Sequence, residues 1–189
     1  MKVYFTASLR GMQYYEQYYR KIYDEIEKLG YAHLDREIFS LNRTTYYSEL
    51  ETTGKIAHLD LYRKKIKSLQ KADVCIFEVS FHSLSIGFQI EKAINYLKPT
   101  IVLYLEGNEP YFLEGVENEK LILRPYNNKN LQQVLKECLE MAQKKKEQRF
   151  NFFLSPDLLS YLEEASKKQG ETKSMYVRNL IENDRNKRR

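Results

Sequence analysis

Apolar and polar positions along the first 143 residues follow two alternating periods. Short runs rich in β-branched and aromatic residues predict buried strands, and segments with an apolar residue every three or four positions predict amphipathic helices. We expect strands at 2–7, 31–34, 73–79, 100–105 and 120–124, and helices at 13–29, 55–71, 85–97 and 131–143. Residues 35–53 show no clear period and are expected to form a loop with one helical turn. Alternating strands and helices predict an α/β fold, a five-stranded parallel sheet of flavodoxin-like or Rossmann-like order.

The last quarter of the chain carries a different pattern. Residues 149–154 alternate around Phe150, Phe152 and Leu154, which is typical of a strand with one apolar face. Ser155-Pro156 then predicts a helix start, Gly170 a helix end, and Thr172 or Ser174 the cap of a second helix. With residues 144–148 as a charged hinge, the sequence predicts two domains, 1–143 and 149–189.

Net charge is distributed unevenly between these two parts. The chain has a formal net charge of +5, and residues 144–189 hold 12 Lys and Arg against 7 Asp and Glu. Residues 1–143 hold 19 of each sign and sum to zero. A basic end on a neutral body indicates an anionic partner, with nucleic acid the first candidate.

Several classes of protein are disfavoured by the sequence. No apolar run is long enough for a membrane span, and the N-terminus shows no signal-peptide pattern, so we expect a cytoplasmic protein without a membrane partner. Cys75 and Cys138 lie far apart among apolar neighbours and are expected to be buried thiols. The three histidines are not spaced as metal ligands, so neither a metal nor a cofactor is predicted.

The pattern of residues 149–183 resembles the ribbon-helix-helix family of the Arc type, in which two chains pair single strands into a DNA-binding ribbon. The resemblance implies a homodimer through that ribbon, with the N-terminal domain as a second candidate contact. It implies base contacts by Arg149 and Asn151, whereas Phe153 stands where a polar residue is usual. Phosphate contacts are implied for Thr172, Lys173 and Ser174 at the second helix start. The alternative is a dimerisation hairpin that never touches DNA.

Three stretches of the N-terminal domain, residues 4–11, 69–74 and 78–93, resemble the nucleoside 2-deoxyribosyltransferase superfamily. The similarity is greatest to its 2'-deoxynucleoside 5'-phosphate N-hydrolase branch. That family's active site combines a tyrosine, an aspartate and a nucleophilic glutamate, which suit an oxocarbenium-like transition state.

Only one of the three catalytic positions is matched in this chain. The resemblance maps the tyrosine to Tyr4, the aspartate to Lys65 and the glutamate to Gln89. An amide is a poor nucleophile, and a cation opposes a developing positive charge. Neither Asp60 nor Glu91 is a good substitute, because each falls on another face of its helix. We therefore expect no catalytic residues and favour a protein that is not an enzyme.

Phosphate-binding features follow the first predicted strand and precede the helix at 85–97. Hydroxyls, a guanidinium and an exposed helix N-terminus suit a nucleoside phosphate. The predicted nucleotide-binding residues are Tyr4, Ser8, Arg10, Gly11, Ser83, Ser85, Gly87 and Gln89. The alternative is that the serines serve only in turns and helix caps and that Tyr4 is a core aromatic.

These features support three hypotheses. The leading one is a nucleotide-sensing, DNA-binding transcriptional regulator whose deoxyribosyltransferase-like domain has lost its catalytic residues. The second is an active nucleoside or nucleotide N-glycosidase, a hydrolase or deoxyribosyltransferase, with a DNA-targeting tail. The third is an antitoxin-like interaction protein with a vestigial pocket.

Overall fold

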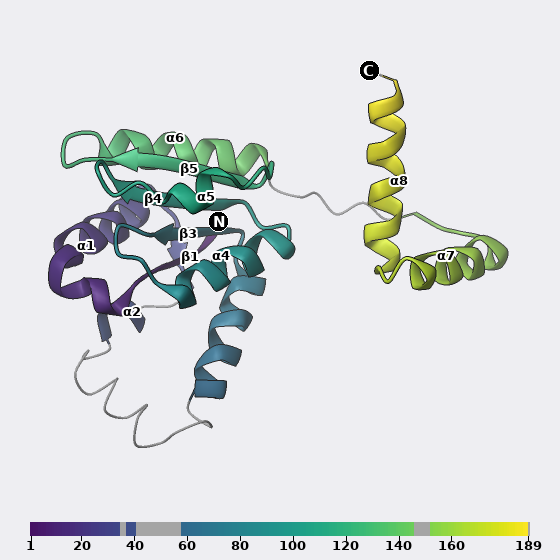
Figure 1. Cartoon of the computed structure of the whole chain (residues 1–189), viewed down its shortest axis with the longest axis horizontal. Helices are drawn as coiled ribbons and strands as arrows, with labels where there is room; N and C mark the ends of the chain where they lie inside the picture. The colour runs from purple at the N-terminus through teal and green to yellow at the C-terminus, as the bar shows by residue number, and fades with distance from the viewer. Residues whose placement is uncertain (35–36, 41–57, 146–151, 189) are drawn as a thin grey trace. The chain divides into compact units, whose positions relative to one another are not determined.

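The computed structural model describes residues 1–34, 37–40, 58–145 and 152–188 (Figure 1). The chain divides into two compact units, Met1–Glu147 and Gln148–Arg189. Each unit is described by itself.

The first unit alternates strands and helices in the predicted order. Its strands are β1 (Lys2–Ala7), β2 (Ala32–His33), β3 (Val74–Glu78), β4 (Thr100–Leu105) and β5 (Leu121–Tyr126). Its helices are α1 (Met12–Lys28), α2 (Glu37–Ser40), a helix over residues 58–71, α4 (Leu84–Asn95), α5 (Tyr111–Glu114) and α6 (Leu131–Lys144). A 3-10 turn, η1 (Leu9–Gly11), follows β1. The four-residue helix α5 was not predicted, because it is too short to show a period. Residues 55–57 of the predicted helix at 55–71 lie outside the described residues.

All strand pairs are parallel, and the order across the sheet is β2-β1-β3-β4-β5. This confirms the expected flavodoxin-like order. The order reverses direction beside β1, and in such sheets ligands bind at the carboxyl ends of the strands near that switch point.

Two hydrophobic cores cover the two faces of the sheet. Phe5 and Ile76 pack with residues of α1 and α6 on one face, and Tyr4 and Phe77 pack with residues of α4 on the other. Adjacent strand residues point to opposite faces, so Tyr4 and Phe5 enter different cores. Tyr4 therefore faces the side that carries α4 and the 58–71 helix.

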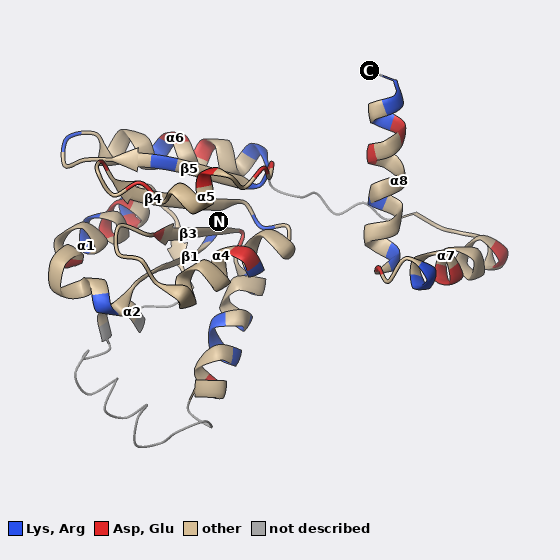
Figure 2. Cartoon of the chain, in the orientation of Figure 1, with Lys and Arg blue, Asp and Glu red and all other residues tan. Residues whose placement is uncertain are grey.

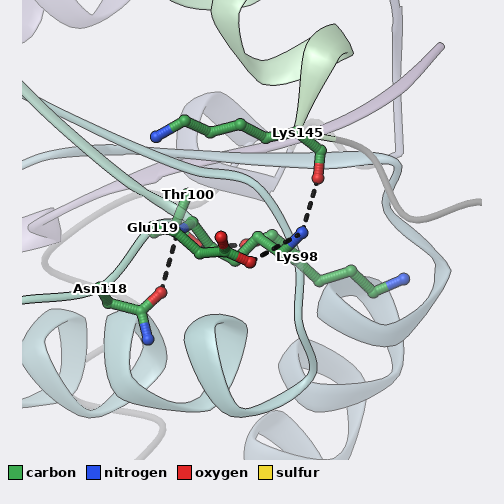
Figure 3. A network of polar contacts seen from close by, with 6 residues as sticks. Lys98, Thr100, Asn118, Glu119 and Lys145 are labelled. Atoms are coloured by element: carbon green, nitrogen blue, oxygen red, sulfur yellow. Dashed lines mark hydrogen bonds and ion pairs between the residues drawn. The ribbon is translucent and has the colours of Figure 1, made fainter. Parts of the chain in front are cut away.

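A polar network at the amino ends of β4 and β5 anchors the end of α6 (Figure 3). The buried Lys120 amine donates to the Lys145 carbonyl at 2.7 Å, and the Lys120 amide donates to Asn118 Oδ1 at 2.8 Å. The Thr100 hydroxyl donates to the Lys98 carbonyl at 2.9 Å. A cation at a helix C-terminus meets the negative end of the helix dipole, so this contact favours the observed end of α6.

The second unit contains two helices, α7 (Pro156–Lys168) and α8 (Lys173–Lys187). Ser155 and Thr172 cap them by accepting hydrogen bonds from the Leu158 and Met175 amides, and Gly170 between them has φ +68°. Both helices and their caps were predicted. The ribbon strand at 149–154 is not confirmed: residues 152–154 form no strand, and 149–151 lie outside the described residues. The ribbon requires hydrogen bonds between the strands of two chains, so one chain by itself lacks the partner strand.

Within the described residues, no helix is long and apolar enough to cross a membrane. Cys75 and Cys138 are buried and unpaired, as expected. Burial raises the pKa of the Cys75 thiol to about 12.

Candidate functional site

A cavity of about 500 Å³ opens at the carboxyl end of β1, on the sheet face that carries α4. β1 and β3 end together, because Ala7 pairs with Glu78. The chain that follows β1, the start of α4 and the 58–71 helix converge there. The described lining residues are Thr6, Ala7, Ser8, Leu9, Arg10, Ile38, His58, Leu61, Lys65, His82, Ser83, Leu84, Ser85, Ile86 and Gln89.

Gln89 and Lys65 line this cavity, and both contact Tyr4 beside it. Tyr4 itself does not line the cavity and is buried in the core with Phe77, as the alternative of a core aromatic states. The fully buried Tyr4 donates its phenolic hydrogen to Gln89 Oε1 at 2.6 Å. The Lys65 amine lies 5.7 Å from the centre of the Tyr4 ring, a cation–π distance. Gln89 Nε2 donates to the Ser85 carbonyl at 3.1 Å, so both ends of this amide are hydrogen-bonded.

The other predicted polar residues gather around the same cavity. Ser8, Arg10, Ser83 and Ser85 all line it. Ser8 and Ser83 occupy N-cap positions, yet neither side chain makes a capping hydrogen bond. The positions of both serines agree with the alternative of turn and cap residues, but their hydroxyls are not used as caps. Their binding of a phosphate stays a prediction.

Two predicted glycines do not line the cavity. A Cβ on Gly11 would lie 2.7 Å from Phe81 Cβ and would also meet the Tyr19 hydroxyl, so this glycine permits close packing. Gly87 lines a neighbouring cavity of about 690 Å³ together with residues 110–113. Each glycine is next in sequence to a residue of the 500 Å³ cavity, but neither lines that cavity.

The lining is basic. Arg10 and Lys65 carry positive charge, His58 and His82 are polar bases, and no described lining residue is acidic. Figure 2 shows the Lys and Arg residues along the 58–71 helix. Neither histidine was predicted as a site residue. His82 could have been predicted, because it lies within the matched stretch 78–93. His58 could not, because its orientation depends on how its helix packs.

Glu78, at the end of β3, forms a buried network on the opposite face of the sheet. Its Oε1 accepts hydrogen bonds from the Tyr126 hydroxyl at 3.0 Å and from both the amide and hydroxyl of Ser80. The Ser80 hydroxyl oxygen also accepts from the Leu105 amide at 2.8 Å. Burial raises the pKa of Glu78 to about 7, although these hydrogen bonds oppose the shift. The network holds the segment that leads from β3 to the cavity.

Comparison with known proteins places the first unit in a family. A protein of Thermofilum pendens named as a 2'-deoxynucleoside 5'-phosphate N-hydrolase is 30% identical over 105 residues, which are 56% of this chain and 68% of that protein. The chain belongs to the 2'-deoxynucleoside 5'-phosphate N-hydrolase family. A Methanosarcina mazei member of the same name is 29% identical over 104 residues, 54% of this chain and 60% of that protein.

Two further matches are more distant. A 5-hydroxymethyl-dUMP N-hydrolase of Tetraodon nigroviridis is 23% identical over 144 residues, 72% of this chain and 96% of that protein. A solved structure of a Clostridium botulinum CMP N-glycosidase covers 74% of this chain and is itself covered to 99%, with a TM-score of 0.47 and 15% identity. No family model matches the chain.

The resemblance maps the two catalytic carboxylates of the family to Lys65 and Gln89, and this mapping stays a prediction. Neither candidate substitute lines the cavity: Asp60 accepts from Arg63 at 3.0 Å, and Glu91 accepts from Asn95 at 3.0 Å. Among the described residues, no group of three His, Cys, Asp or Glu side chains is arranged to hold a metal.

The predicted DNA-binding residues of the second unit are only partly described. Arg149 and Asn151 lie outside the described residues, and Phe153 is fully exposed. Thr172 is the N-cap of α8, and Lys173 and Ser174 form its first turn. Lys173 donates to Glu163 of α7, which ties the two helices together. Several apolar side chains of this unit are exposed, namely Phe152, Phe153, Leu158, Leu159, Tyr161, Met175, Leu180 and Ile181.

Proposed function

We propose that the first unit binds a 2'-deoxynucleoside 5'-phosphate in the 500 Å³ cavity and senses it rather than cleaving it. One observation carries the proposal. The segment after β1 and the start of α4 bring Ser8, Arg10, Ser83 and Ser85 to one cavity whose described lining holds no carboxylate. Hydroxyl and guanidinium donors suit a phosphate, and the absence of lining carboxylates removes repulsion of an anion.

Two groups of lining residues suit different parts of such a ligand, and we call them the phosphate end and the sugar end of the cavity. The phosphate is assigned to the end with Arg10 and the serines. The sugar is assigned to the end with Tyr4, Lys65 and Gln89, where the family carries its catalytic groups. Family membership supports this assignment, since the relatives are named for 2'-deoxynucleoside 5'-phosphates.

Calorimetric titration with the deoxynucleoside 5'-monophosphates and with the matching nucleosides tests this proposal. The phosphorylated ligands should bind and the unphosphorylated ones should bind more weakly. Arg10→Ala should weaken binding of the monophosphate by about 1.5–3 kcal/mol, the value of a hydrogen bond to a charged group. Arg63→Ala is the matched control, because Arg63 pairs with Asp60 outside the lining and should leave affinity unchanged. Equal affinity for nucleosides and nucleotides would contradict the proposal.

The names of the relatives favour a second candidate, an active nucleotide N-glycosidase with rearranged catalytic groups. We expect release of free base to be absent or far below about 1 per second, because Gln89 and Lys65 replace the carboxylates. Gln89→Glu should not restore turnover, since Lys65 still opposes positive charge at the sugar. Chromatographic assay of free base decides between the candidates. Turnover near 1 per second that is lost in Tyr4→Phe would establish the N-glycosidase.

For the second unit we propose DNA binding by a homodimer, with the first unit reporting nucleotide occupancy to it. The excess positive charge of residues 144–189 supports a nucleic-acid partner. The exposed apolar side chains support pairing with a second chain, because two short helices bury little by themselves. Such a protein would be a ligand-responsive transcriptional regulator of the ribbon-helix-helix kind. Differential affinity of the nucleotide for the DNA-bound and free forms would couple the two events.

A further inference from the structure

Lys65 provides a chemistry that neither a carboxylate nor an amide offers at this end of the cavity. A primary amine condenses with an aldehyde to form an imine, the reaction by which enzymes capture carbonyl substrates on lysine. Lys65 is the only lysine among the described lining residues. Its amine is held over the Tyr4 ring, at the end of the cavity assigned to the sugar.

The other nitrogen-bearing groups near Lys65 are poorer nucleophiles than a primary amine. The Gln89 amide is hydrogen-bonded at both ends, to Tyr4 and to the Ser85 carbonyl. Tyr4 is fully buried and donates its hydrogen to Gln89. Tyr4 and Gln89 are thus hydrogen-bonded to each other, and the Tyr4 ring lies under the Lys65 amine. The Arg10 guanidinium at the phosphate end stays protonated at any ordinary pH, so it is not a nucleophile.

A sugar phosphate with an open-chain aldehyde fits both ends of this cavity. Hydrolysis of the glycosidic bond of a 2'-deoxynucleoside 5'-phosphate yields 2-deoxyribose 5-phosphate, whose C1 is an aldehyde when the ring opens. Its phosphate matches the serines and Arg10, and its C1 then lies at the far end of the chain, toward Tyr4 and Lys65. Resting on the proposed function, this assignment concerns the sugar phosphate rather than the nucleotide.

We propose that the cavity captures 2-deoxyribose 5-phosphate as an imine on Lys65. The Lys65 ammonium first gives a proton to water, and the Nζ lone pair then attacks the C1 aldehyde. A proton moves from nitrogen to the former carbonyl oxygen to give a carbinolamine. The C–O bond then breaks, the hydroxyl leaves as water with the second proton from nitrogen, and the C=N bond forms. One amine and one aldehyde thus give one imine and one water, without an oxidant or reductant. Hydrolysis by water reverses the step and releases the sugar phosphate.

Reductive trapping tests this proposal on the full chain. The protein is incubated with 2-deoxyribose 5-phosphate and cyanoborohydride, and intact mass and peptide mapping locate the adduct. We expect one reduced sugar phosphate per chain, on Lys65. Lys65→Arg keeps the positive charge and should abolish the adduct. Lys64→Arg, at an exposed neighbour outside the described lining, should retain it. Unphosphorylated 2-deoxyribose should label at least tenfold more slowly, and a deoxynucleoside 5'-monophosphate should compete.

The outcomes separate this proposal from the nucleotide site on which it rests. Nucleotide binding by calorimetry together with no adduct would overturn the imine and leave the nucleotide site intact. Equal labelling of Lys65→Arg and the unmodified chain, or labelling spread over surface lysines, would also overturn it. Absence of nucleotide binding in folded protein would overturn the proposed function itself. A Lys65→Arg variant with an unchanged midpoint of urea denaturation shows that loss of the adduct reflects lost amine chemistry and not lost folding.

Discussion

At the scale of single residues, the cavity depends on a carboxyl group that never faces it. Glu78 is fully buried, and through Ser80 it connects the end of β3 with the Leu105 amide at the end of β4. Residues 82–86, which line the cavity, follow directly after Ser80. Glu78 is therefore a structural support for one cavity wall, and its protonation state should affect the stability of the first unit.

The raised pKa of Glu78, about 7, gives a pH dependence with a definite sign. A carboxyl group that binds its proton more tightly in the folded state stabilises that state below its ordinary pKa, and this stabilisation is lost as pH rises through 7. We expect the free energy of unfolding to fall between pH 5 and pH 8 by on the order of 3 kcal/mol from this group. Glu78→Gln should remove this part of the change of unfolding free energy with pH, measured by urea denaturation at several pH values. Glu91→Gln, on the surface, should keep it. An unchanged pH dependence in Glu78→Gln would contradict the assignment.

At the scale of elements, the starts of α7 and α8 and the end of α6 are each stabilised by a specific side-chain contact. Ser155 and Thr172 cap α7 and α8 locally, whereas α6 ends against Lys120 from a distant strand start (Figure 3). Lys120→Met keeps the aliphatic packing but removes the amine from the Lys145 carbonyl. We expect a loss of about 1–3 kcal/mol in unfolding free energy, as for a buried hydrogen bond to a charged group. Lys136→Met, on the exposed face of α6, should change it by less than about 0.5 kcal/mol. Similar values for both variants would show that the contact contributes nothing.

At the scale of the whole molecule, a nearly neutral α/β unit is joined to a basic helical unit. Removal of residues 149–189 should abolish binding to duplex DNA and leave nucleotide affinity unchanged, because the described lining residues of the cavity belong to the first unit. For the full chain, affinity for DNA should fall steeply with salt as counterions are released. Fluorescence anisotropy with labelled duplexes at several salt concentrations measures both effects. Undiminished DNA binding by the shortened chain would assign the interaction to the first unit instead.

The sequence alone predicted the order of strands and helices, the parallel sheet and the caps of the last two helices. These features arise from local patterns: apolar periodicity, a Ser-Pro helix start and a glycine with positive φ. The resemblance to family motifs also predicted the following residues for the site: Tyr4, Ser8, Arg10, Lys65, Ser83, Ser85 and Gln89.

Only the tertiary structure decided which of those residues meet. It joined Tyr4 to Gln89 across 85 positions, brought His58 and His82 to the cavity, and directed Gly11 into packing against Phe81. It also buried Glu78 beside Tyr126. Such contacts depend on how helices rotate against the sheet, and that rotation is set by the packing of both cores together and by no single segment.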